Sequence, residues 1–177
     1  MVATIENFEK SKELFKQGDV SSTLDIIEKT IDQLDRNNAA QRKELEEFLH
    51  RILKYCRDNN LKSEEAMVLR NLGRLHSKYR NHAEGLKYSY QALKIQKKIG
   101  RKLDVAEGLV FLAEDLEISG NYEECIKSFQ EAADIYHELG KLRKEKEIRR
   151  EIERLKEFSK KMVEDEYYLN KFHIDKY

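Results

Sequence analysis

Apolar residues recur every three or four positions along most of the chain, and short polar stretches interrupt them. The stretch 21–35 is typical, with Leu24, Ile27, Ile31 and Leu34 on one side of a helical projection. This spacing is that of the buried face of an α-helix. The interruptions are rich in Gly, Asn and Asp, which favour turns. The pattern predicts eight helices, at residues 4–16, 21–35, 39–57, 63 onward, 82–99, 103–119, 122–139 and 142–169.

Residues suited to capping lie at several of the predicted helix ends. Thr4 and Ser63 are expected to cap the first and fourth helices, because a short hydroxyl side chain accepts a hydrogen bond from a free backbone N–H of the first turn. Gly100 is expected to end the fifth helix in the left-handed conformation. Gly140 is expected to end the seventh helix.

The segment 65–144 contains the same pattern twice. A shift of 40 residues places Leu72 on Leu112, and Gly100 on Gly140. A fixed period of this size is the signature of a stacked repeat. Each unit holds two apolar helical stripes that an isolated pair of helices cannot bury, so neighbouring units must supply the missing surface. The period predicts an all-α array of helical hairpins.

Small residues occupy positions where the two helices of a hairpin are expected to cross. In the first unit they are Gly73 and Ala92, and in the second Ala113 and Ala132. A larger side chain there would push the helix axes apart, which destabilises a packed core.

The second unit carries a set of short motifs in a fixed order. They are Leu112-Ala113, Leu116, Gly120-Asn121-Tyr122, Glu124-Cys125-Ile126, Phe129 and Ala132. The first unit carries fewer of them, namely Leu72-Gly73, Asn81, Glu84, Leu86 and Ala92. With these motifs the chain resembles the tetratricopeptide repeat (TPR) family, in a variant with a 40-residue period and no proline. His76 and Gly85 depart from the family pattern, which usually has Tyr and Ala there.

The resemblance implies a single domain over 1–177, folded as a right-handed solenoid of TPR-like hairpins. Within it, 1–60 would hold degenerate copies, 64–140 two clear units, and 141–177 a long capping helix with an aromatic tail. By the same resemblance the first helix of each hairpin lines a concave groove. The candidate peptide-binding residues are Met67, Arg70, Asn71, Arg74, Lys78, Glu107, Val110, Phe111 and Glu114.

The charges of these groove residues leave two interpretations open. Arg70 and Arg74 lie one helical turn apart and could hold a carboxylate or phosphate through charge-assisted hydrogen bonds. Glu107 and Glu114 would repel that same ligand, so the Arg and Glu side chains could instead pair with each other or remain solvated. Phe111 is an aromatic outside the core stripe, and it could anchor a peptide or the chain's own C-terminus.

The predicted last helix carries a narrow apolar stripe, formed by Ile148, Ile152, Leu155, Phe158 and Met162. A stripe of this width suits a capping helix over the last hairpin or a coiled-coil seam with a second copy, which would make a homodimer. The interspersed Glu residues argue against nucleic-acid binding along this helix. The aromatic tail 164–177 could pack onto the groove, onto a partner subunit or onto another protein.

Composition narrows the remaining classes. The formal net charge is zero, so there is no global attraction for polyanions or anionic membranes. No apolar run approaches the roughly 20 residues that span a bilayer, and no signal peptide is expected at the N-terminus. Cys56 and Cys125 lie on apolar stripes, as reduced cysteines of a cytoplasmic protein would.

No catalytic motif is present, so the sequence predicts that the protein is not an enzyme. Glu47 and His50 have the Glu-x-x-His spacing of di-iron bundles, but the second such motif is missing, and no metal or other cofactor is expected. The first functional hypothesis is a protein-interaction module that binds a peptide or protein segment in the groove. A self-assembling structural protein is the alternative, and an RNA-binding helical repeat is a weaker one.

Overall fold

Helices follow one another along the described part of the chain, and no strand occurs there. The computed structural model describes the backbone of residues 2–35 and 37–174, and the side chains of 6–35 and 37–164. The helices are α1 (Val2–Lys16), α2 (Val20–Gln33), α3 (Ala39–Asp58), α4 (Lys62–Lys78), α5 (His82–Ile99), α6 (Lys102–Ile118), α7 (Tyr122–Glu138) and α8 (Leu142–Ile174). The prediction of an all-α fold is confirmed.

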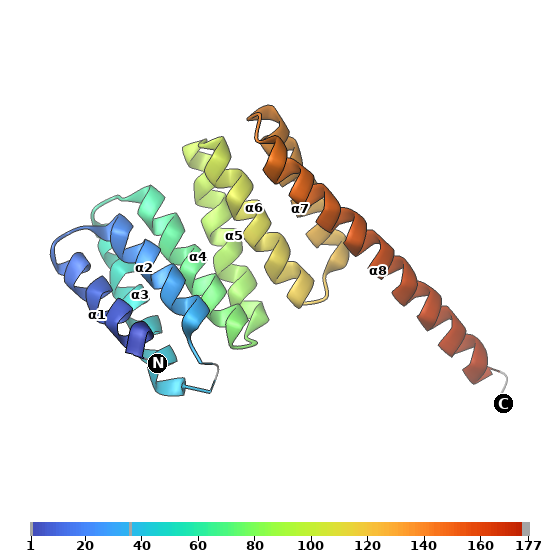
Figure 1. Ribbon diagram of the computed structural model, residues 1–177, viewed down its shortest axis with the longest axis horizontal. Helices are drawn as coiled ribbons and strands as arrows, with labels where there is room; N and C mark the ends of the chain where they lie inside the picture. Colours follow the sequence, from blue (N-terminus) through green and yellow to red (C-terminus); the bar gives the residue numbers. More distant parts are fainter. Residues whose placement is uncertain (1, 36, 175–177) are drawn as a thin grey trace.

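The helices stack side by side in two layers (Figure 1). The even-numbered helices form one layer, in which α2 packs on α4 and α4 on α6, while α8 is tied to α6 by an ion pair between Glu107 and Lys144. The odd-numbered helices form the other layer. There α1 contacts α3 through the rings of Phe8 and Phe48, and α5 contacts α7 through a hydrogen bond from Tyr90 to Glu124.

Two apolar clusters form the core and meet at α5. The first joins α2, α3 and α4, and it includes Ala92 of α5. The second joins α6, α7 and α8, and it includes Leu93 of α5. Successive residues of one helix therefore belong to different clusters, so the array buries its apolar surface continuously between repeats. The degenerate N-terminal segment contributes fully buried side chains such as Leu24 and Leu49.

The crossing of α4 and α5 differs from the predicted one. The atoms nearest to a methyl group on Gly73 would be Ser89 Oγ, at 2.6 Å, and the carbonyl oxygen of Gly85, at 3.2 Å. These contacts replace the predicted pairing of Gly73 with Ala92. They also explain why Gly85 stands where the family has Ala, since a methyl group at that position would collide with Ser77.

The N-terminal caps are also partly different. Thr4 and Ser63 lie inside α1 and α4, so neither is an N-cap. Leu61 holds the N-cap position of α4 without any side-chain hydrogen bond. Gly100 has the predicted left-handed conformation, with φ 77°.

Left-handed residues occur at 60, 80, 100, 120 and 140, which is one every 20 residues, and Gly18 adds a further one near the N-terminus. The first two of the five are Asn60 and Arg80, and the others are glycines. The turns therefore follow half of the 40-residue period, and they do so even where the sequence has no glycine.

α8 is longer than predicted and runs away from the stacked helices (Figure 1). Ile152 and Leu155 are buried against α7, and Phe158 meets the ring of Tyr122 at the start of α7. The helix continues to Ile174, five residues past the predicted end at 169. Its backbone does not return to the other helices, so packing of the tail onto the groove is not supported as far as residue 174, and residues 175–177 lie outside the described part.

Candidate peptide-binding groove

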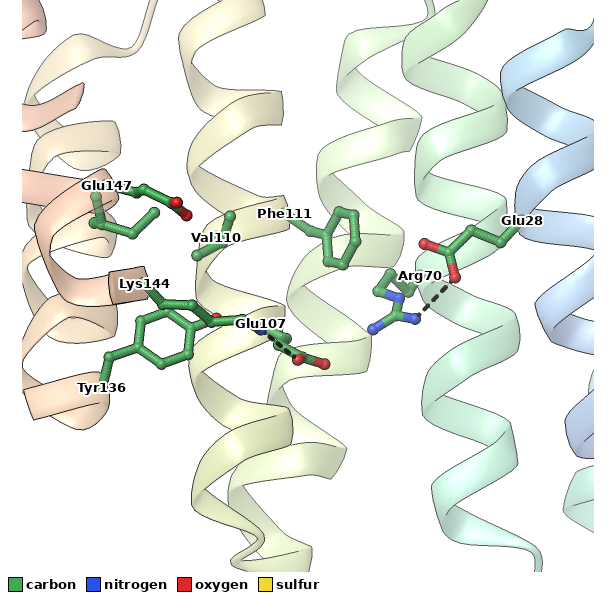
Figure 2. A pocket seen from close by; sticks show the side chains of 9 residues that line it. Glu28, Arg70, Glu107, Val110, Phe111, Tyr136, Lys144 and Glu147 are labelled. Atoms are coloured by element: carbon green, nitrogen blue, oxygen red, sulfur yellow. Dashed lines mark hydrogen bonds and ion pairs between the residues drawn. The ribbon is translucent and has the colours of Figure 1, made fainter. Parts of the chain in front are cut away.

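Three cavities follow α4 and α6 along the even-numbered layer. The central cavity, of about 420 Å³, is lined by Glu28, Arg70, Glu107, Val110, Phe111, Tyr136, Lys144, Glu147 and Ile148 (Figure 2). The N-end cavity, of about 310 Å³, includes Met67, Arg70, Gln96 and Glu107. The C-end cavity, of about 420 Å³, includes Arg74, Lys78, Glu114 and Asp115. The three cavities together are called the groove below.

Eight of the nine candidate residues line this groove, and Asn71 does not. Asn71 is buried, with 1% of its surface exposed, and its side-chain amide donates to the backbone carbonyl of Leu24 in α2. The prediction for Asn71 is wrong because α2 packs directly on this side of α4. Its place in the repeat is taken by Phe111 in α6, which is only half-buried.

The two arginines of α4 are already engaged by α2. Arg70 forms an ion pair with Glu28 at 3.3 Å. Arg74 bonds to Glu28 and also to Asp32, at 2.6 Å. The alternative in which these arginines pair with Glu107 and Glu114 is wrong, because both arginines pair with carboxylates of α2. A carboxylate clamp would have to displace both α2 carboxylates.

Sequence reasoning missed these α2 partners, although a signal for them exists. Glu28 and Asp32 are four residues apart, as are Arg70 and Arg74. Two acidic and two basic side chains, each pair one turn apart, match when two helices lie side by side. The 40-residue register does not show this match, because it compares Arg70 with Thr30 and not with Glu28.

Phe111 lies against both guanidinium groups. Its ring centre is 4.6 Å from Cζ of Arg70 and 5.1 Å from Cζ of Arg74. Such cation–π contacts favour a fixed ring orientation. Figure 2 shows Phe111 and Val110 between Arg70 on one side and Lys144 with Tyr136 on the other. Phe111 is half-buried, so part of its ring remains available to a ligand.

The opposite wall of the central cavity comes from α7 and α8. Lys144 bonds to Glu107 at 3.1 Å, and this hydrogen bond raises the pKa of Lys144. Burial raises the pKa of Tyr136, whose ring lies 5.3 Å from Nζ of Lys144. Since the cations and the glutamates of this cavity pair within the protein, the surface left for a ligand is mainly that of apolar and aromatic groups.

Other candidate chemistry has structural explanations. Cys56 and Cys125 are free and buried, and burial raises the pKa of each thiol to about 11. His76 is buried 3.3 Å from Glu46 and stacks on Tyr88. Within the described side chains, no group of three or more His, Cys, Asp or Glu residues is placed to hold a metal ion. No helix of the described region has the length and apolarity needed to cross a bilayer.

The stacked hairpins define a helical-repeat protein, and the comparisons give the kind of repeat. Residues 64–136 match the family model described as tetratricopeptide repeat. The predicted resemblance to the TPR family is thus confirmed over this segment. A comparison with curated proteins finds no significant match.

Two solved structures are similar in fold. The crystal structure of BtubC (BKLC) from P. vanneervenii is 16% identical, with a TM-score of 0.62, over 78% of this chain and 56% of that chain. This chain therefore spans little more than half the length of that protein. A Podosopora anserina protein described as a kinesin light chain with nearly identical TPR-like repeats is 12% identical, with a TM-score of 0.46, over 88% of this chain and 95% of that chain. The first of these similarities supports the fold.

Proposed function

We propose that this protein is an interaction module that binds a segment of another protein in the groove between α4, α6 and α8. TPR arrays are scaffolds for protein interactions, which supports the general class. The protein is proposed to bind without catalysing a reaction. Its two buried free thiols are consistent with a reducing compartment such as the cytoplasm.

The observation that carries this proposal is the placement of Phe111. The ring is held by two guanidinium groups, borders a cavity of about 420 Å³ and is only half-buried. Rigid aromatic side chains in partly formed pockets are frequent binding hot spots, because they offer a large contact area at a small entropic cost. An RNA-binding function is disfavoured, since Arg70, Arg74 and Lys144 of the groove are paired with carboxylates.

The proposal is tested by selection from a displayed library of random peptides, followed by calorimetric titration of the selected peptides. We expect Phe111→Ala to weaken binding by about tenfold or more, which corresponds to a hot spot of at least about 1.4 kcal/mol. Tyr90→Ala is the matched control, because Tyr90 is an exposed aromatic on α5 in the other layer. Equal affinities for the wild type and Phe111→Ala would refute the groove as the binding site.

A second function, self-association through α8, is favoured by one observation. The face of α8 that packs on α7 continues past Phe158, and the next apolar residues, Met162 and Val163, are exposed. Lys160 and Lys161 precede Val163 and Glu164 follows it, so an antiparallel second copy centred near Val163 would oppose unlike charges.

Light scattering over a dilution series tests this second function. We expect a dimer in the wild type and a monomer in the double variant Met162→Glu, Val163→Glu. A monomeric wild type at all concentrations would exclude self-association through α8.

A further inference from the structure

The C-end cavity of the groove has a different chemistry from the central one. It lies where α2, α4 and α6 end and α5 begins, and its volume of about 420 Å³ is within the range of ligand pockets. The residues that line it are Ile31, Asp32, Arg74, Ser77, Lys78, Arg80, His82, Glu114, Asp115 and Ile118.

Asp115 is a buried carboxylate at a position that the repeat otherwise fills with a core residue. It is 5% exposed, and the 40-residue register aligns it with Leu75, which is fully buried. Its hydrogen bond comes from the hydroxyl of Ser89, at 2.6 Å. No residue of the described region forms an ion pair with Asp115. A buried carboxylate is costly unless a cation compensates it.

Two further buried polar atoms of this cavity have no hydrogen-bond partner. They are Oγ of Ser77 and Nδ1 of His82, and Ser77 is 7% exposed. Both atoms can accept a hydrogen bond, the imidazole nitrogen when it carries no proton. Buried polar groups are normally satisfied. Both residues line the same cavity as Asp115.

The basic residues of the cavity do not supply the missing cation. Arg74 is bonded to Glu28 and Asp32. Lys78 donates to the backbone carbonyls of Ile31 and Asp32. Arg80 is exposed on the turn after α4, at the rim of the cavity.

Glu114 adds a second carboxylate beside Asp115. The side chain of Glu114 reaches solvent, yet the walls of the groove desolvate it and raise its pKa, against the opposing effect of Arg74. An anionic ligand would meet both carboxylates, whereas a cation with several N–H donors would satisfy the acceptors.

From these contacts we infer that the C-end cavity binds a basic side chain, lysine or arginine, of the protein segment that occupies the groove. The inference rests on the proposed function and specifies its ligand. Asp115 accepts from the ammonium or guanidinium group, and Ser77 and His82 offer the further acceptors. The Asp115 carboxylate is thereby the specificity determinant of the groove.

The distance between the central cavity and the C-end cavity also defines how far apart the two recognised residues of the bound segment lie. Phe111 and Asp115 are one turn apart on α6, a rise of about 6 Å. In an extended chain this distance corresponds to about two residues. The segment therefore carries an apolar residue for the central cavity and a basic residue two positions away for the C-end cavity.

The inference is tested with N-acetyl-arginine amide as the probe, titrated into the full chain and followed by amide NMR shifts. We expect shifts at the C-terminal ends of α4 and α6 and at the start of α5, and none there with N-acetyl-norleucine amide. Asp115→Asn keeps the size of the side chain and an acceptor for Ser89, and it should weaken probe binding by about tenfold or more. Asp115→Leu, the residue of the first unit, should fold and abolish probe binding.

Two outcomes would overturn the inference. One is the absence of shifts up to the solubility limit of the probe, and the other is equal binding by the wild type and a folded Asp115→Asn. Failure here is distinct from failure of the proposed function. Selected peptides that depend on Phe111 but show no preference for basic residues would leave the groove in place and remove the basic pocket.

Discussion

The close crossing of α4 and α5 can be tested by adding one methyl group to each of two helical glycines. In Gly73→Ala the new methyl group would lie 2.6 Å from Ser89 Oγ and 3.2 Å from the carbonyl oxygen of Gly85. The carbonyl belongs to the α5 backbone and cannot move unless that helix shifts, and the Ser89 hydroxyl is held by Asp115. In Gly108→Ala the nearest atoms belong only to the side chain of Gln96.

Both variants gain the same helix propensity from the replacement of Gly by Ala, and they differ in the cost of overpacking. Replacing Gly by Ala inside a helix stabilises it by about 1 kcal/mol. Overpacking against a fixed neighbour costs about 1–3 kcal/mol, so Gly73→Ala should be destabilised by up to about 2 kcal/mol. Gln96 can rotate away from Gly108, and its buried Oε1 has no hydrogen bond to lose. Gly108→Ala should therefore be unchanged or more stable by up to about 1 kcal/mol.

Equilibrium urea unfolding followed by far-UV circular dichroism measures both variants against the wild type. The repeat pattern alone predicts that Gly73→Ala is harmless, since the second unit has Ala113 at this position. With Gln96 rotating away at no cost, the structure predicts that Gly73→Ala is less stable than Gly108→Ala by about 1–3 kcal/mol. If Gly73→Ala were as stable as Gly108→Ala, the close contact between α4 and α5 would be incorrect.

Three further predictions concern buried groups. Ala132 is fully buried, so Ala132→Leu should lower the free energy of unfolding by about 1–3 kcal/mol. Lys146→Ala is the control at an exposed position. A melting midpoint of Ala132→Leu no lower than that of Lys146→Ala would contradict this prediction. Cys56 and Cys125 should react with a thiol reagent only in urea, because burial raises the pKa of each to about 11; stoichiometric labelling of the native protein would show that they are accessible. Burial lowers the pKa of His76, with Glu46 opposing, so the unfolded chain binds more protons and stability should fall as the pH drops below about 6.5. His76→Gln should reduce that slope in a pH series of urea melts, and an unchanged slope would assign it to other groups.

The sequence was sufficient for the helices and for the stacking, because both depend on the apolar period. Most helix ends lie within one or two residues of their predicted places, since Gly and Asn mark the turns. The predicted caps Thr4 and Ser63 failed for a local reason. A hydroxyl near a helix start is compatible with several starting positions, and α4 begins at Lys62 without a side-chain cap.

The groove was only partly predictable. The register placed Arg70, Arg74 and Phe111 on the face that the three cavities follow, but it could not show that α2 supplies the partners of the arginines. The packing of α2, in the degenerate segment, on α4, in the first regular unit, depends on how far one helix is shifted along the other. The repeated motifs contain no information about this shift. Asp115 was missed as well, although a charged residue aligned with Leu75 is a signal that the register alone contains.

An amide NMR map of the full chain bound to a library-selected peptide locates the surface that binds the peptide. Binding in the groove should shift amides on the groove side of α4 and α6, centred on Phe111 and extending to Asp115, and these shifts should be lost in Phe111→Ala. Shifts confined to the odd-numbered layer or to the free end of α8, with Phe111→Ala binding normally, would contradict binding in the groove.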